Sequence, residues 1–463
     1  MMKVLIVVHQ FFPAHFYGTE RLVLNLSKQM QRMGHKVKVL TYAFNEKDGL
    51  TTKSGALYRE YTYQGVPVVS ICHIGRLPPE NFFIYDDQLG WILDAILAEE
   101  QPDIIHVCHS MWIGEVIRSA KKKEIPVLMT LTDFWMMCPR GIASTPEGSL
   151  CEGTGDGKKC LSDCYPGYSW KSKIAERFEQ TKEIFSYASR VVAATCFLKL
   201  MFESQGHVQD ITIIPFGKDY KDIHKKKRTY NLDSNIIIGY LSSLTPHKGA
   251  HILIEAFIRV NPKNIRLKIY GDPRSAPAYF DLLIKVSQGH EGIEFCGPYE
   301  YEEMPKIFDI TDIIAVPSIW WENSPLVLLR AQAHNVPAIV SELGGLSEII
   351  TNGKDGFTFN VGDSDPNSDS VKTLSMIIRK ISDNPRILND INAGIRSPPR
   401  IEEEAFEYEC LYQTIVASKR SSSLQDNTSF QRNQDDPVRQ SAGTGITEGL
   451  VQKRDNVQQH DRM

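Results

Sequence analysis

Two series of short, continuous apolar runs, with helix-patterned segments between them, constrain this chain more than any other feature of its sequence. The first run, residues 4–8 (VLIVV), lacks the polar alternation of a half-exposed strand and predicts a parallel strand buried on both faces. A helix is expected from about Thr19 to Gly34, because apolar side chains recur there at helical spacing. Further strands of this series are predicted at residues 37–41, 104–107, 127–131, 191–194 and 211–214.

A polar stretch at residues 220–235 predicts a linker, and the pattern restarts after it. The second series of strands is predicted at residues 236–241, 267–270, 293–296, 313–316 and 338–340. Strands that alternate with helices predict an α/β fold with doubly wound parallel sheets. We therefore expect two Rossmann-like domains, at residues 1–219 and 236–400, with ligands bound in a crevice at the carboxyl ends of their strands.

Charge and hydropathy exclude several classes of protein. The net charge of −4 provides no broad basic surface, so a nucleic-acid partner is not expected. No apolar run approaches the length of a transmembrane segment, and the apolar N-terminus predicts a strand rather than a cleaved signal peptide. We expect a cytoplasmic protein whose nine cysteines stay reduced. One more helix is predicted at residues 401–417, and the polar residues 418–463 predict a disordered tail.

Five segments of the chain carry a family resemblance: FFPAHFYGTE, PDIIHV, LTDFWMMCPR, LTPHKGAHILIEAF and VPSIWWENSPLVLLRAQAHNVPAIVSELGGLSEIITNGKDGFTF. From Lys3 to about Tyr412 the chain resembles the group-1 family of retaining glycosyltransferases with the GT-B fold. The resemblance implies two Rossmann-like domains that face a central cleft, with the acceptor on the N-terminal domain and a nucleotide-sugar donor on the C-terminal one. It also implies that the helix at 401–417 crosses back to the N-terminal domain.

The donor site is expected where a helix begins after the strand at 313–316. Ser324 is a good N-cap and Pro325 a good first helical residue, with Leu326 and Val327 in the first turn. Free backbone N–H groups and the positive end of the helix dipole suit a diphosphate without a divalent metal. The alternative is that Ser324-Pro325 marks only a helix start.

By resemblance, two charged residues serve the donor. Glu322 matches the first glutamate of the family's pair and would contact the donor sugar, with Asn323 beside it on the loop. Lys248, in His-Lys-Gly, matches the phosphate-binding lysine and would offset charge on the departing diphosphate. Gly18 would let the backbone approach the diphosphate or the acceptor, although a plain turn glycine is an equal alternative.

Three positions depart from the family pattern. The second glutamate of the pair is replaced by Arg330, the usual arginine five residues before Lys248 by Ser243, and the histidine before Asp133 by Thr132. We hypothesise that Arg330 compensates for Ser243 by donating to phosphate or ribose oxygens; the alternative is an exposed helix residue. His109 is a candidate to replace the missing histidine on the acceptor side, with Asp133, or else a structural hydrogen bonder.

Four cysteines fall within residues 138–164, a segment rich in Gly and Lys: Cys138, Cys151, Cys160 and Cys164. Four thiolates would order such a loop around a structural zinc ion, although the spacing is irregular. Free thiols or a disulfide are the alternatives.

The sequence therefore predicts a retaining glycosyltransferase that moves a sugar from a nucleotide-sugar donor to a glycan, a lipid-linked molecule or another hydroxyl acceptor. Such an enzyme would serve polysaccharide biosynthesis, with no cofactor required for catalysis, in the cytoplasm or at the inner face of the membrane. Two alternatives remain open. One is a catalytically silent relative that binds nucleotide or glycan, which the three departures favour. The other is a nucleotide-sugar epimerase on the same two-domain plan.

Overall fold

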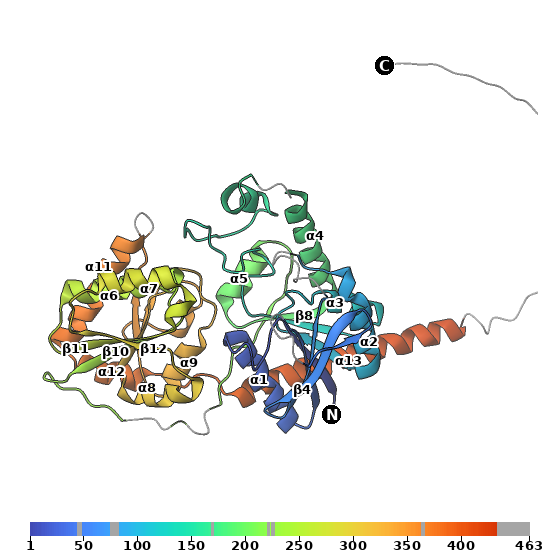
Figure 1. Cartoon of the computed structure of the whole chain (residues 1–463). Coiled ribbons are helices and arrows are strands. Elements are labelled where there is room, and N and C mark those ends of the chain that lie inside the picture. The colour runs from blue at the N-terminus through green and yellow to red at the C-terminus, as the bar shows by residue number, and fades with distance from the viewer. Residues whose placement is uncertain are drawn as a thin grey trace, which may run out of the picture. The chain divides into compact units, whose positions relative to one another are not determined.

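The computed structural model of the chain describes residues 1–43, 49–74, 83–167, 171–219, 223, 227–362 and 366–432. Met1–Ala417 form one compact unit and Ser418–Met463 another. Within the first unit lie two α/β lobes (Figure 1): the N lobe is built on a nine-stranded sheet and the C lobe on a six-stranded sheet. The fold is therefore the predicted pair of Rossmann-like domains.

The N-lobe sheet has the strand order β3-β4-β5-β2-β1-β6-β7-β8-β9. Strand β1 lies inside the sheet and pairs in parallel with both β2 and β6. The chain order therefore runs outward from β1 in two directions, and the gap between β1 and β6 is the switch point where open α/β sheets bind ligands. The strands that the sequence predicts are all present, at β1 (Lys3–Val8), β2 (Lys36–Tyr42), β6 (Ile104–Val107), β7 (Val127–Leu131), β8 (Ala188–Ala193) and β9 (Thr212–Ile213).

Three N-lobe strands were not predicted: β3 (Thr51–Lys53), β4 (Ala56–Tyr63) and β5 (Val66–Cys72). They extend the sheet beyond β2, and β4 pairs antiparallel with both of its neighbours. Side chains of β4 alternate between half-buried and exposed along much of its length, so this strand lacks the continuous apolar run of a strand covered on both faces. A search of the sequence for continuous apolar runs therefore misses this antiparallel part of the sheet.

Helices cover both faces of the N-lobe sheet. One face packs against α1 (Gly18–Arg32) and the first turns of α13 (Ile401–Arg432). The other face packs against α2 (Gly90–Glu100), α3 (Glu115–Lys122), α4 (Lys171–Tyr187) and α5 (Cys196–Ser204). The helices cover the two faces of the sheet and leave the ends of its strands uncovered.

The C-lobe sheet has the order β12-β11-β10-β13-β14-β15, and every pair in it is parallel. Five strands match the prediction: β10 (Ile236–Leu241), β11 (Ile265–Tyr270), β12 (Ile293–Gly297), β13 (Ile313–Val316) and β14 (Ala338–Ser341). The short β15 (Gly356–Phe359) was not predicted.

The C-lobe helices also form two layers. One face of the sheet packs against α6 (Ala250–Val260), α7 (Pro277–Val286), α11 (Pro366–Asp383) and α12 (Ile387–Gly394). The opposite face packs against α8 (Met304–Ile310), α9 (Leu326–Ala333) and α10 (Leu346–Ile349). Figure 1 shows α6 and α7 on one side of this sheet and α8 on the other.

Helix α13 is longer than expected. The sequence predicted a helix at 401–417 and a disordered tail at 418–463, but α13 continues through Arg432. No Gly or Pro occurs between Ile401 and Arg432 to end the helix, which explains the error. Residues 433–463 lie outside the described part of the chain, as do 220–222 and 224–226 of the predicted linker; residues 227–235 form no helix or strand. In the part of the chain that the structure describes, no helix is long and apolar enough to cross a membrane.

A buried polar network attaches the start of α13 to the N-lobe sheet. His106 on β6 is fully buried, and its Nδ1 lies 2.6 Å from the Tyr412 hydroxyl while its Nε2 lies 2.7 Å from Thr130 Oγ1. Thr130 Oγ1 is also 2.9 Å from the Tyr408 hydroxyl. Burial lowers the pKa of His106 to about 3, so the imidazole is neutral and both of its nitrogens are satisfied.

We expect Tyr412→Phe to destabilise the protein, because it leaves the buried Nδ1 of His106 without a hydrogen-bond partner. The free energy of unfolding should fall by about 1–3 kcal/mol, measured by urea denaturation. Phe406→Leu is the control, since Phe406 lies on the same helix but is 57% exposed, and it should change little. Equal stability of Tyr412→Phe and wild type would contradict a structural role for this network.

Candidate active site

A cavity of about 290 Å³ lies at the carboxyl ends of the strands and is lined by both lobes. The C lobe contributes residues that follow β10 and β13, which are neighbouring strands. Of the predicted donor residues, the cavity walls include Gly18, Lys248, Glu322, Ser324, Pro325, Leu326 and Val327. The structure therefore brings most of the predicted donor set to one place.

Lys248 is positioned by a tight turn between β10 and α6. It ends a 3₁₀ turn, Pro246–Lys248, and the next residue, Gly249, has a φ of +71°. A side chain at Gly249 would also place its Cβ 1.8 Å from the carbonyl oxygen of Pro317. Only glycine fits this position, so the fold requires Gly249, and the turn that Gly249 permits places Lys248 at the cavity.

Glu322 and Lys248 form a partly buried ion pair on the cavity wall. Glu322 Oε1 accepts hydrogen bonds from Lys248 Nζ at 2.6 Å, Ser318 Oγ at 2.7 Å and Trp320 Nε1 at 2.8 Å. Burial would raise the pKa of Glu322, but Lys248 and the two neutral donors lower it below its ordinary value. The carboxylate is thus held ionised and in one orientation at the cavity.

The helix at the cavity begins one residue later than predicted. Leu326 is the first residue of α9, Pro325 occupies the N-cap position with a ψ of 120°, and the Ser324 side chain makes no cap hydrogen bond. The Pro325 carbonyl accepts from Leu328 N–H, which closes the first turn. Among the described residues, no group accepts a hydrogen bond from the N–H of Leu326 or Val327, so two backbone donors are free at the cavity.

Asn323 does not line the cavity. It is 8% exposed, accepts a hydrogen bond from Thr195 Oγ1 at 2.9 Å and donates through Nδ2 to the Thr132 carbonyl at 3.2 Å. Trp321 behaves similarly, since its Nε1 donates to the Cys151 carbonyl at 3.1 Å. The loop between β13 and α9 therefore contacts the N lobe, a role that the sequence did not suggest.

Arg330 also lies away from the cavity walls. Its guanidinium carbon is 3.9 Å from the centre of the Tyr301 ring, and the residue is only 9% exposed. The interpretation of Arg330 as an exposed helix residue is therefore wrong.

Gly18 lines the cavity, but the fold does not require a glycine at this position. A Cβ added to Gly18 would meet only Leu326 Cδ1, at 3.9 Å, which is an ordinary van der Waals contact.

The acceptor-side candidates His109 and Asp133 form a pair at the carboxyl ends of β6 and β7. His109 Nε2 lies 3.0 Å from Asp133 Oδ2, and His109 Nδ1 accepts from the Met111 N–H at 3.2 Å. The latter contact assigns the ring proton to Nε2, so His109 donates to Asp133. Asp133 Oδ1 accepts from Trp135 N–H at 2.8 Å, and the Asp133 side chain remains 40% exposed. A small cavity lined by Thr132, His109 and Asp133 adjoins them.

Sequence reasoning missed two residues beside this pair. The His9 ring is 4.0 Å from that of His109, and His9 Nε2 lies 3.8 Å from Glu20 Oε1. Burial, with His109 and His15 nearby, holds the pKa of His9 well below its ordinary value, while burial raises the pKa of Glu20. The position of His9 in the sequence could have identified it. His9 directly follows β1, which lies beside β6, the strand that leads to His109.

The four cysteines of the Cys-rich loop are free thiols. In the described part of the chain, no three or more His, Cys, Asp or Glu side chains are arranged to hold a metal ion. Burial, followed by the charges of Cys138, Cys164 and Cys151, raises the pKa of Cys160 to about 12.

Comparisons with known proteins agree with the geometry. Two family models match: Glycosyltransferase Family 4 over residues 16–221, and Glycosyl transferases group 1 over residues 235–376. The Anabaena protein HepE in complex with UDP and glucose has a similar fold, with a TM-score of 0.62, 14% identity, and coverage of 89% of this chain and 100% of that one.

Two relatives show how far the similarity extends. A D-inositol 3-phosphate glycosyltransferase of Corynebacterium efficiens is 30% identical over 30% of this chain and 34% of its own length. The chain spans about a third to a half of the length of several such curated relatives. An uncharacterized glycosyltransferase of Methanocaldococcus jannaschii is 30% identical over 75% of this chain and 83% of its own. With its two GT-B lobes and the Lys248–Glu322 pair on the cavity wall, the chain belongs to the group 1 family of glycosyltransferases.

Proposed function

We propose that this chain transfers a sugar from a nucleotide-sugar donor to a hydroxyl acceptor with retention of configuration. The observation that carries the proposal is the convergence of Lys248, Glu322 and the two free N–H groups of α9 on one cavity. Cationic and N–H donors suit a diphosphate, and a fixed carboxylate suits a sugar ring that gains positive charge in the transition state.

In this proposal, Lys248 and the start of α9 bind the diphosphate of the donor. The N–H groups of Leu326 and Val327 and the positive end of the helix dipole donate to its oxygens, with Ser324 and Pro325 shaping the turn and Gly18 opposite. Lys248 would then share its charge between Glu322 and the diphosphate. These groups supply the positive charge that a divalent metal supplies in other transferases.

The proposed reaction breaks the bond between the anomeric carbon and the diphosphate oxygen, and the electron pair stays with the departing diphosphate. The acceptor oxygen bonds to the same face of that carbon, and its proton passes to a diphosphate oxygen. Glu322, ionised beside the sugar, would stabilise the positive charge on the ring. HepE, a structural neighbour, is solved with UDP and glucose, which supports a nucleotide-sugar donor here.

For the acceptor side we propose Asp133 as the group that binds the acceptor hydroxyl. Its carboxylate is partly exposed at the strand ends, and each of its oxygens already accepts one fixed donor. His109 is then a positioning residue, because its Nδ1 is occupied by the Met111 N–H. We propose an acceptor of the glycan or lipid-linked class, handled in the cytoplasm at the inner face of the membrane during polysaccharide synthesis.

One assay separates the proposal from its two rivals. The protein is incubated with several nucleotide sugars, with and without candidate acceptors, and the released nucleoside diphosphate is measured. A transferase releases diphosphate in step with acceptor glycosylation. A silent relative binds nucleotide without release, and an epimerase converts the donor sugar with no acceptor consumed. Either of the last two results would refute glycosyl transfer.

We also propose a structural zinc ion in the loop at residues 138–164, because four cysteines fall within this one segment and zinc binding would draw their thiolates together. Protein prepared under reducing conditions without chelators should contain about one equivalent of zinc, measured by elemental analysis, as expected for one tetrahedral site. Chelation should speed hydrogen exchange in this loop without unfolding either lobe. Cys160→Ser should lose the zinc and Cys296→Ser, outside the loop, should keep it. Metal-free wild type would end this proposal.

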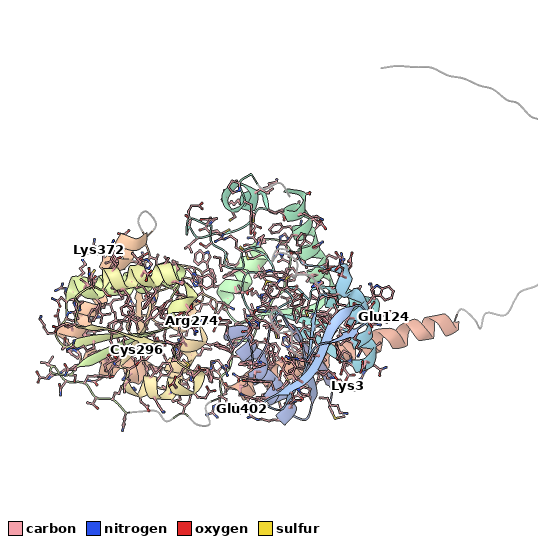
Figure 2. All side chains as sticks on the ribbon, viewed as in Figure 1. Lys3, Glu124, Arg274, Cys296, Lys372 and Glu402 are labelled. Carbon is pink, nitrogen blue, oxygen red and sulfur yellow. The ribbon has the colours of Figure 1, made fainter. Side chains whose placement is uncertain are left out.

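Lys248→Ala should weaken binding of a nucleoside diphosphate by about 1.5–3 kcal/mol, because a charge-assisted contact is lost. Binding of the corresponding nucleoside should change much less, and titration calorimetry measures both. The nucleotide is the one that stabilises the protein most in a thermal-shift screen. Lys372→Ala is the matched control, an exposed lysine of α11 labelled in Figure 2. Equal losses for nucleoside and diphosphate would contradict the role of Lys248.

A further inference from the structure

Three cationic side chains from three separate segments surround the ring of Tyr301. Arg21 comes from α1, Lys218 from the segment that leaves β9, and Arg330 from α9. The guanidinium carbons of Arg21 and Arg330 each lie 3.9 Å from the ring centre, and Lys218 Nζ lies 6.0 Å from it. Such a concentration of like charge is costly unless something neutralises it.

Two of the three cations are buried, since Arg330 is 9% exposed and Lys218 is 4% exposed, while Arg21 is half-buried. The Nε and Nη1 atoms of Arg330 are buried and have no hydrogen-bond partner among the described residues. No carboxylate of the described chain forms an ion pair with Arg21, Lys218 or Arg330. Buried donors of this kind normally have partners in native proteins, so these two N–H groups are available to a bound anion.

Two acids influence the cluster without forming an ion pair with it. Glu302 is exposed, and its charge favours the charged form of Arg330. Glu404 is buried; its Oε2 accepts from the Gly217 N–H at 2.8 Å, and burial raises its pKa to about 8. Burial, followed by the charges of Arg330 and Arg21, lowers the pKa of Lys218 to about 7. Positive charge therefore dominates at neutral pH.

The ring of Tyr301 cannot take the place of an anion. Its face attracts a cation by its quadrupole, but it offers no acceptor to the buried N–H groups of Arg330. An anion with several oxygens and two charges can accept from guanidinium and ammonium groups that approach from different directions. A single carboxylate would leave most of the charge of three cations uncompensated.

We propose that Arg21, Lys218 and Arg330 form a binding site for a tetrahedral oxyanion of the phosphate class, next to Tyr301. None of these three residues, nor Tyr301, lines the donor cavity, although its walls include the neighbouring Leu22 and Leu326. It does not rest on the proposed transferase reaction. A bound anion would link α1, the segment after β9 and α9, which also carries the free N–H groups of the donor cavity.

Sulfate is the probe, because its double negative charge does not change with pH. It is titrated into full-length Lys248→Ala protein, in which the lysine of the donor cavity is absent. Adding Arg330→Gln should weaken sulfate binding about 10- to 100-fold, as expected for loss of a hydrogen bond between charged groups. Adding Arg274→Gln should change nothing, since Arg274 is an exposed arginine, labelled in Figure 2, that pairs with Asp272.

Lys218→Met is the second variant, in case Arg330→Gln fails to fold. It should also weaken sulfate binding, and it should flatten the pH dependence. In the parent protein, affinity should fall from pH 6 to pH 8.5, because Lys218 loses its charge while Glu404 gains one. Soaking crystals with selenate should give an anomalous peak between the three cations.

Inorganic phosphate and a hexose phosphate are titrated in parallel to identify the source of the anion. Tighter binding of inorganic phosphate assigns the site to the free ion, and tighter binding of the hexose phosphate assigns it to a phosphorylated metabolite. Folded Arg330→Gln and Lys218→Met proteins with unchanged sulfate affinity would overturn the proposal. So would a loss confined to nucleoside diphosphate affinity, which would instead place Arg330 in the donor site.

Discussion

Parallel strands present all their carboxyl ends at one edge of a sheet, and the whole candidate site depends on this constraint. Lys248 follows β10 and Glu322 follows β13, and these strands are neighbours although the residues are 74 positions apart. In the N lobe, His109 and Asp133 follow β6 and β7, which are also neighbours. Chain connectivity therefore brings together side chains that local structure alone could not.

The Lys248–Glu322 pair and the cations around Tyr301 differ in how their charges are balanced within the chain. Glu322 accepts from one cation and two neutral donors, so it stays oriented if Lys248 turns toward a ligand. This is the preorganisation that an active site needs, because no reorientation is required when charge develops. Around Tyr301, by contrast, the buried Nε and Nη1 atoms of Arg330 have no fixed partner among the described residues, so a bound anion there would supply the compensating charge that we propose.

Much of the fold followed from the sequence because strands buried on both faces leave an unmistakable apolar run. Strand β4 has no such run, because its side chains are largely half-buried or exposed. Strand β15 has only four residues, so any such run in it is short. In the site, Lys248 and Glu322 were recognised from local motifs. Asn323 and Arg330 were placed by the same motif but point elsewhere, because their directions depend on Thr195 of the N lobe and on Tyr301. No periodicity within one segment contains that information.

The N-lobe sheet ends on its two shortest strands, and this has a consequence for solubility. Strand β3 has three residues, one of them Lys53, whose ammonium pairs with Glu99; strand β9 has two. An open sheet edge exposes unpaired backbone groups that can recruit a strand from another molecule, and short, charged edges offer little to pair with. Long, flat edges on a nine-stranded sheet would favour pairing between molecules, and these two short strands offer little backbone for such pairing.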